Sequence, residues 1–134
     1  MSQSRIMDTL RYEWLPDELS VCRLAADERV PVWLPIRGFT TVTRTNEELS
    51  IVCASSAVPP GVRSEHGWTV LKVLGPLPFE AVGILRRLAD PLAMAGIPII
   101  AFGTFDTDYV LVKRGQEEAA DEVLAASGLL LVST

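Results

Sequence analysis

Residue types that carry most catalytic and metal chemistry are scarce in this chain. Of its 134 residues, one is histidine and two are cysteine. His66 stands in a loop-like stretch between Glu65 and Gly67, where a single histidine is usually solvated. The sequence contains no nucleophile motif, no phosphate-binding glycine motif and no cluster of metal ligands. We therefore expect no enzyme activity, no metal site and no cofactor.

Positive charge and long apolar runs are also scarce. Lysine and arginine number 12 against 17 aspartate and glutamate residues, which gives a net charge of −5. The averaged field of the protein therefore repels nucleic acid and anionic membranes. No apolar run approaches the length of a membrane span, and no signal-like leader opens the sequence. Nucleic acid and membranes are thus not expected partners, and the expected location is cytoplasmic.

Apolar residues are plentiful enough to form a core. They make up 49% of the chain, against 22% charged residues. A domain of this length buries about two-thirds of the surface that it exposes when unfolded. Cys22 and Cys53 each lie in an apolar, strand-like stretch without the spacing of a metal or redox pair, so both are expected to be small core side chains. The length allows one domain, or two small modules that share a core.

Apolar periodicity in the second half of the chain predicts the element order βαββαβ. Strands are expected at 68–74, 97–102, 107–113 and 129–132, and helices at 81–95 and 116–127. The strand at 97–102 is almost entirely apolar, which predicts that both of its faces are covered. Two helices on one face of a four-stranded antiparallel sheet form the ferredoxin-like arrangement.

The first expected helix contains a proline. Its apolar stripe, which should pack on the sheet, comprises Val82, Leu85, Leu88, Ala89 and Leu92. Because an interior proline costs about 3 kcal/mol, Pro91 predicts a kink or a new helical start capped by Asp90. Gly96 supplies a left-handed stop before the next strand.

The first half of the chain predicts a smaller version of the same module. Strands are expected at 19–24, 39–44 and 49–53, and the segment 54–67 is expected to be a joining loop. Pro31 and Pro35 interrupt the segment between the first two strands, which is too broken for a long helix. We predict an α+β protein in which a degenerate, shortened module over residues 1–60 precedes a ferredoxin-like module over residues 61–134.

The turn between the strands at 97–102 and 107–113 carries two carboxylates. Asp106 and Asp108 are accompanied there by Thr104, Phe105 and Thr107. An ordinary hairpin turn is the alternative interpretation, because aspartate and threonine are common in turns. Carboxylates in this position would favour the ammonium group of a ligand.

Four segments resemble the ACT-domain family, and in particular two-module ACT-like proteins similar to the cytosolic arginine sensors called CASTOR. The segments are 41–53, 67–79, 88–97 and 104–113, which together cover most of the chain after residue 38. The resemblance implies a non-catalytic regulatory protein that binds a small molecule, commonly an amino acid, at an interface between modules or in a dimer. The sensors have four modules where this chain has two, so two copies could be needed to form a comparable pocket.

Ligand contacts in the family fall on the first strand-to-helix loop and around the second strand. The matching residues are Gly75, Pro76, Leu77, Phe79 and Glu80 in the loop, and Thr104, Phe105 and Asp108 in the second region, where the carboxylate of Asp106 is a further candidate. A glycine admits a ligand close to the backbone, and free N–H groups near Phe79–Val82 suit a carboxylate, although Gly75-Pro76 is also a common turn. An amino acid has charges for both ends of such a site. The alternative is a protein–protein interaction or dimerisation module without a small-molecule ligand, and the sequence specifies neither the ligand nor the downstream partner.

Overall fold

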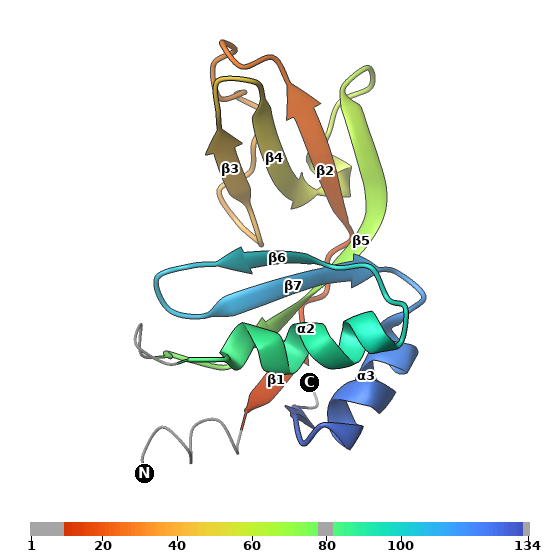
Figure 1. The fold of residues 1–134 in the computed structure, drawn as a ribbon. Helices are drawn as coiled ribbons and strands as arrows, with labels where there is room; N and C mark the ends of the chain where they lie inside the picture. The colour runs from red at the N-terminus through yellow and green to blue at the C-terminus, as the bar shows by residue number, and fades with distance from the viewer. Residues whose placement is uncertain (1–9, 78–81, 133–134) are drawn as a thin grey trace. The chain divides into compact units, whose positions relative to one another are not determined.

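The computed structural model describes residues 10–77 and 82–132 of the chain. The chain divides into two compact units, residues 16–69 and the combination of residues 1–15 with 70–134. We call the first the inserted unit and the second the split unit. Strand β5 (Arg63–Val73) passes through the boundary and contributes residues to both (Figure 1). The predicted module boundary after residue 60 lies within the inserted unit. The two compact units do not test where the predicted modules begin and end, so this boundary stays a prediction.

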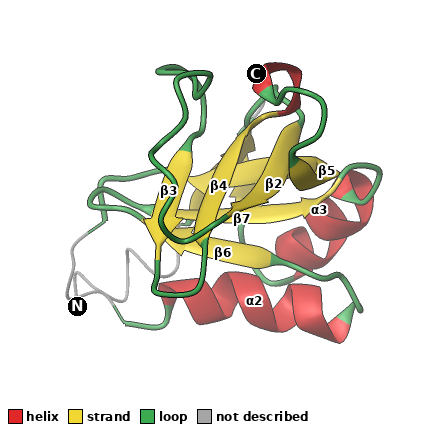
Figure 2. Cartoon of the chain, turned by 90° about the horizontal axis from the view of Figure 1, so that it is seen from above, coloured by secondary structure: helices red, strands yellow, loops and turns green. Residues whose placement is uncertain are grey.

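The split unit has the ferredoxin-like architecture that the sequence predicts. From β5 onward its elements are α2 (Ile84–Met94), β6 (Ile100–Gly103), β7 (Asp108–Lys113), α3 (Glu117–Ala126) and β8 (Leu130–Leu131), in the order βαββαβ. Both helices cover one face of the sheet, where Leu88 and Leu92 of α2 and Leu124 of α3 are buried (Figure 2). The fold is therefore α+β, as expected.

A strand that the sequence analysis did not predict, β1 (Arg11–Trp14), completes this sheet. It runs antiparallel to β5 and parallel to β8, and so separates the first and last strands of the βαββαβ unit. The strand order in the split unit is β6-β7-β5-β1-β8. Four residues are too few for a two-residue periodicity to stand out from the surrounding loop, which explains why β1 was missed.

A hydrogen-bonded aromatic pair fixes β1 to α3. The Tyr12 hydroxyl donates to Asp121 Oδ1 at 2.6 Å, and Trp14 Nε1 donates to the same oxygen at 2.9 Å. The two rings meet edge to face with their centroids 6.3 Å apart. Burial, and then the hydrogen bond and charge of Asp121, raise the pKa of the Tyr12 phenol. The phenol therefore stays protonated, and donates to Asp121, throughout the neutral pH range.

The buried stripe of α2 differs from the predicted one. Its buried side chains are Ile84, Leu88 and Leu92, whereas Val82 is 78% exposed and Leu85 is exposed as well. Val82 precedes the helix, and Leu85 is rotated by about 100° around the axis from the buried Ile84. The helix therefore packs through positions four residues apart, and the predicted stripe was wrong at its first two members.

The predicted new start at Pro91 is wrong, because α2 runs without interruption from Ile84 to Met94, and the alternative of a kink stays a prediction. Only the hydrogen bond that a residue-91 N–H would donate is lost, and Ala95 N–H still donates to the Pro91 carbonyl at 3.1 Å. Gly96 ends the helix in the left-handed region, with a φ of 73°, as predicted.

Strand β6 is not the fully covered strand that its apolar sequence predicts. It begins at Ile100, it pairs only with β7 among the described strands, and it exposes Ala101. Ile97 is buried in the core of the split unit before the strand begins, so the apolar run does not require a second covered face. The last strand, β8, is likewise shorter than predicted, because Leu129 N–H donates to the Leu124 carbonyl of α3, at 3.0 Å, instead of to a neighbouring strand.

The inserted unit contains the three strands predicted for the first half of the chain. They are β2 (Leu19–Leu24), β3 (Thr41–Arg44) and β4 (Leu49–Ala54), followed by the short 3-10 helix η1 (Ser55–Ala57). With β5, their order across the sheet is β3-β4-β2-β5. Counted along the unit this is 2-3-1-4, the order of β6, β7, β5 and β8 in the split unit when β1 is left out. A loop at 25–40 and η1 stand in the chain where the split unit has its helices, which supports the prediction of a shortened module.

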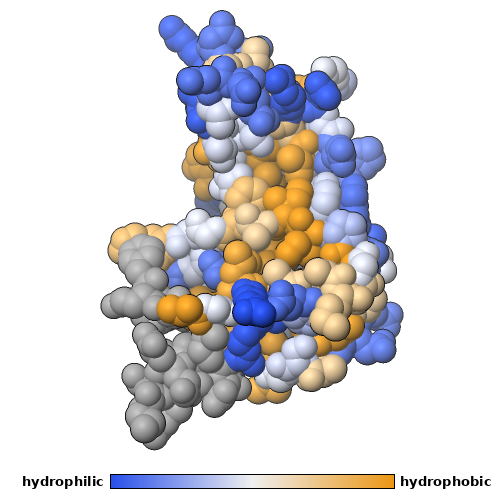
Figure 3. Space-filling view, viewed as in Figure 1, coloured by the Kyte–Doolittle hydropathy of each residue, from blue (hydrophilic) through white to orange (hydrophobic). Residues whose placement is uncertain are grey.

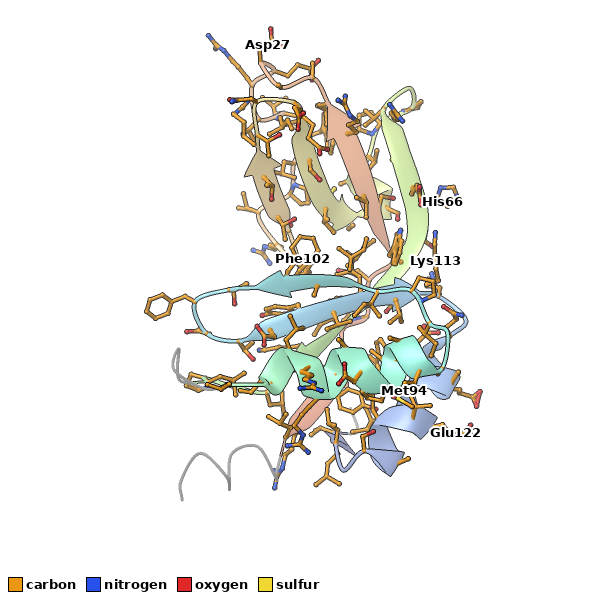
Figure 4. The ribbon with its side chains drawn as sticks, viewed as in Figure 1. Asp27, His66, Met94, Phe102, Lys113 and Glu122 are labelled. Carbon is orange, nitrogen blue, oxygen red and sulfur yellow. The ribbon has the colours of Figure 1, made fainter. Side chains whose placement is uncertain are left out.

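Two smaller predictions in this unit have different outcomes. Cys22 and Cys53 are buried free thiols in a cluster with Leu49 and Ile51, as predicted. Burial, and then the neighbouring Cys53, raise the pKa of Cys22 to about 11. The predicted loop at 54–67 is shorter, because β5 begins at Arg63, so His66 lies on a strand with its side chain exposed (Figure 4).

Replacing Asp121 tests the attachment of β1. Asp121→Ala should lower the free energy of unfolding by about 2 to 4 kcal/mol, because two partly buried donors lose their acceptor and each unpaired donor costs about 1 to 3 kcal/mol. Urea unfolding monitored by circular dichroism measures the change. Glu122→Ala, at the exposed neighbouring position, is the control and should change it by less than about 0.5 kcal/mol. Equal losses in the two variants would contradict this role of Asp121.

Candidate functional site

The two loops predicted to form a ligand site lie against each other. Leu77 N–H, in the loop after β5, donates to the Asp106 carbonyl in the β6–β7 turn at 2.8 Å. Gly75 has no room for a side chain, since a Cβ there would stand 2.9 Å from the Asp106 carbonyl oxygen and 3.1 Å from Thr107 Cβ. The structure therefore joins the end of β5 to the β6–β7 turn by backbone contact, within the split unit.

Thr107, which was not among the predicted site residues, organises the turn. Thr104 donates to the Thr107 carbonyl through its N–H at 2.9 Å and through its hydroxyl at 3.0 Å. The buried Thr107 hydroxyl donates to the Val73 carbonyl at the end of β5, at 2.7 Å. The turn is thereby fixed to the neighbouring strand. No sequence signal distinguishes this threonine from the other threonines of the turn.

Asp108 is the carboxylate that the turn places in a partly desolvated position. It is the first residue of β7 and lies opposite Gly103, where an added Cβ would stand 3.5 Å from Asp108 Oδ1. Its carboxylate makes no hydrogen bond or ion pair with any residue that the structure describes. Burial raises the pKa of this carboxyl group. A carboxylate that has lost part of its hydration and has no partner would gain from a ligand cation.

The other predicted residues contribute differently. Asp106 has an exposed side chain and lies in the turn rather than on the strand, so its link to the site is its backbone carbonyl. Phe105 is 79% exposed. Phe79 and Glu80 lie outside the described residues. The two predicted carboxylates are thus not equivalent, and only Asp108 is desolvated.

The donors available for a ligand carboxylate also differ from the expectation. Leu77 N–H is engaged by Asp106, and α2 begins only at Ile84, after Gly83, without a side-chain cap. The N–H groups of Gly75 and Asp106 make no hydrogen bond to any residue within 10–77 and 82–132. These two amides, on either side of the contact between the loops, are the donors that remain.

Neither a metal-binding cluster nor a membrane-spanning helix is found among the described residues. Across residues 10–77 and 82–132, no three histidine, cysteine, aspartate or glutamate side chains come close enough together to hold a metal ion. Within the same ranges, the helices are too short and too polar to span a bilayer.

Two protein families match successive parts of the chain. The ACT domain matches residues 63–126, and a family described as an N-terminal domain matches residues 17–61. The second match falls within the inserted unit, and most of the first falls within the split unit. None of the curated proteins compared with the chain matches it.

Solved structures resemble the whole chain. A protein from Agobacterium tumefaciens is 36% identical with a TM-score of 0.87, and each chain covers 92% of the other. A Vibrio cholerae protein, described as of unknown function and possibly a transport protein, is 19% identical with a TM-score of 0.75, over 95% of this chain and 96% of that one. The regulatory subunit of aspartate kinase from Thermus thermophilus, in its ligand-free form, is 11% identical with a TM-score of 0.58, over 83% of this chain and 93% of that one. The last two likenesses show the fold alone.

Substitution of Gly75 tests the contact between the two loops. Gly75→Ala should lower the free energy of unfolding by about 1 to 3 kcal/mol, because the new Cβ meets backbone that has no space to move. Gly103→Ala is the matched control, because its Cβ would make an ordinary contact, and its loss should be smaller. Urea unfolding of both variants decides the point, and a larger loss for Gly103→Ala would show that the loops are not in close contact.

The burial of Asp108 predicts a pH dependence. Its folded pKa lies above the ordinary value, so protonation stabilises the folded state, and this contribution is lost as pH rises through the folded pKa. The free energy of unfolding of the wild type minus that of Asp108→Asn should therefore fall as pH rises from about 4 towards 7. Urea titrations of both proteins measure the difference, in which all other carboxylates cancel. A difference that is flat or that rises with pH would contradict the burial.

Proposed function

Because the chain belongs to the same family as the Agobacterium tumefaciens protein and carries an ACT domain, a regulatory domain, over residues 63–126, we propose that it is a non-catalytic regulatory protein that binds an amino acid. The proposed site lies where the loop after β5 meets the β6–β7 turn. The proposal includes a cytoplasmic location and a homodimer, with neither nucleic acid nor membrane as a partner.

The single observation that carries the proposal is the Asp108 carboxylate. It is partly buried, its pKa is raised by that burial, and no described residue pairs with it. A group of this kind destabilises the unliganded protein at neutral pH, and a bound ammonium would relieve the cost. Perturbed carboxylates without a structural partner are more typical of binding sites than of scaffolds.

The other end of the ligand would meet backbone amides. Gly75 N–H and Asp106 N–H, in the two loops that meet there, have no partner among the described residues, and a glycine lets the ligand approach the main chain. A charge-assisted hydrogen bond at each end of a zwitterion is worth roughly 1.5 to 3 kcal/mol. The two ends together favour an α-amino acid over a simple cation or a simple anion.

One side of the proposed site is open to solvent. Phe105 and Asp106 are exposed at its edge, so we propose that a second copy of the chain closes it when the ligand binds, as expected for ACT modules that bind ligands at interfaces. The likeness to the arginine sensors rests on Thr104, Phe105 and Asp108, so arginine is the first ligand to test.

Thermal shift with the common amino acids, arginine first, tests this function. A ligand at a hundredfold excess over its Kd stabilises by about 2.7 kcal/mol, which raises the Tm of a domain of this size by roughly ten degrees. Asp108→Asn should lose this increase, and its unliganded Tm should be no lower than that of the wild type, because the partly buried charge is removed. Asp106→Asn is the matched control and should keep the increase, because Asp106 contributes its backbone.

Two results would contradict the proposal. If no amino acid raises the Tm of the wild type, the alternative of an interaction module without a small-molecule ligand is favoured. If the increase persists in Asp108→Asn, a ligand binds elsewhere on the protein.

A further inference from the structure

The loop between β2 and β3 in the inserted unit exposes large aliphatic side chains. Val32 is fully exposed, Ile36 is 96% exposed, and Val30 is about half exposed. These side chains belong to the segment Asp27–Arg37, which we call the proline loop because it contains Pro31 and Pro35. Soluble proteins seldom expose several neighbouring aliphatic side chains so completely, and such patches mark interaction surfaces.

The exposure follows from how the proline loop is held. Trp33 and Leu34 pack against the buried cluster around Cys22, and Leu34 N–H closes a turn on the Pro31 carbonyl at 3.2 Å. The Arg44 guanidinium on β3 donates to the carbonyls of Ala26 and Glu28 at the start of the loop. With Trp33 and Leu34 turned inward, Val32 and Ile36 are held outward. The surface is therefore presented by an anchored loop and not by a free tail.

Charged side chains flank the aliphatic ones and are themselves unpaired. Asp27 and Glu28 open the loop and Arg37 closes it, and all three are exposed (Figure 4 labels Asp27). Their side chains, like that of Arg29, make no hydrogen bond or ion pair with any part of the chain that the structure describes. Asp17 lies near Gly38 but does not pair with Arg37. The first end of the loop, with Asp27, Glu28 and Arg29, therefore carries a net charge of −1, and the last end carries the positive charge of Arg37, with the aliphatic side chains between them.

Two copies of the loop that are related by a two-fold axis present complementary ends to each other. In a two-fold contact each residue i meets j and j meets i, so the acidic end of one loop faces the basic end of the other twice. The aliphatic side chains then meet in the middle and are removed from water. We propose that the proline loop forms a two-fold contact between two copies of this chain.

Other exposed apolar side chains fit a partner less well. A groove of about 420 Å³ between the C-terminal ends of α2 and α3 is lined mainly by apolar residues, including Met94 and Val123. In Figure 3, strongly hydrophilic residues lie on α2 next to weakly hydrophobic ones towards its C-terminal end. Arg86 and Asp90 of α2 already pair with each other at 2.8 Å. Their charges therefore do not indicate which partner would bind to this groove. These exposed residues serve as controls below.

The contact can be tested by sedimentation of the full chain, without added ligand, over a wide concentration range. Wild type should show a reversible monomer–dimer equilibrium. Val32→Asp and Ile36→Asp should each weaken it by at least about tenfold, and circular dichroism should remain unchanged because both side chains are exposed. Val82→Asp and Met94→Asp place the same charge at exposed apolar positions of the split unit and should dimerise like wild type. Asp108→Asn should also dimerise, because this proposal does not rest on the ligand site.

A charge exchange identifies which ends of the loops meet. Arg37→Glu makes both ends of the loop acidic, and the double variant Asp27→Lys with Glu28→Lys makes both ends basic, so each variant alone should remain monomeric. An equal mixture of the two should form heterodimers, and the dimer should weaken as salt is added. The proposal is overturned if wild type is monomeric throughout, if the loop variants dimerise like the controls, or if the mixture stays monomeric.

Discussion

The hydrogen bond from the buried Thr107 hydroxyl to the Val73 carbonyl, 2.7 Å long, holds the arrangement at the proposed site together. It secures the β6–β7 turn at the end of β5, where Leu77 N–H can reach the Asp106 carbonyl and Gly75 must lack a side chain. A buried hydroxyl without an acceptor would cost free energy, so the turn has one favourable position. That position sets the first residue of β7, and with it the desolvation of Asp108.

The two aspartates of the turn differ in the hydration of their carboxylates. Asp106 keeps its side chain in water and contributes through its backbone, whereas Asp108 has lost hydration without gaining a partner in the part of the chain that the structure describes. The cost is small enough for a folded domain to carry, and under the proposed function a bound cation would recover it. The same groups that stabilise the turn therefore leave one carboxylate partly buried and without a partner among the described residues.

The parts of the fold that could be predicted are those with long apolar periodicity. The βαββαβ order, the stop at Gly96 and the strands of the inserted unit follow from it, because buried faces repeat along helices and strands. The four-residue strand β1, the uninterrupted helix through Pro91 and the exposure of Val82 depend on tertiary contacts and exact element ends, which one sequence does not reveal. At the site, the residue types were apparent, but the use of the Leu77 amide and the difference between Asp106 and Asp108 depend on atomic geometry.

Both units cover one face of a sheet, but with different elements. In the split unit, helices cover one sheet face, and each helix is thick enough to keep its apolar stripe inside and its polar residues outside. In the inserted unit, a sheet with the same strand order is covered by a loop. A single extended segment is too narrow to keep apolar side chains on one side and polar side chains on the other. Because the Trp33 and Leu34 side chains point inward, the side chains next to them in the loop point to solvent. Exposed Val32 and Ile36 are thus a geometric consequence of covering a sheet without a helix, and a second copy of the loop would remove that exposure.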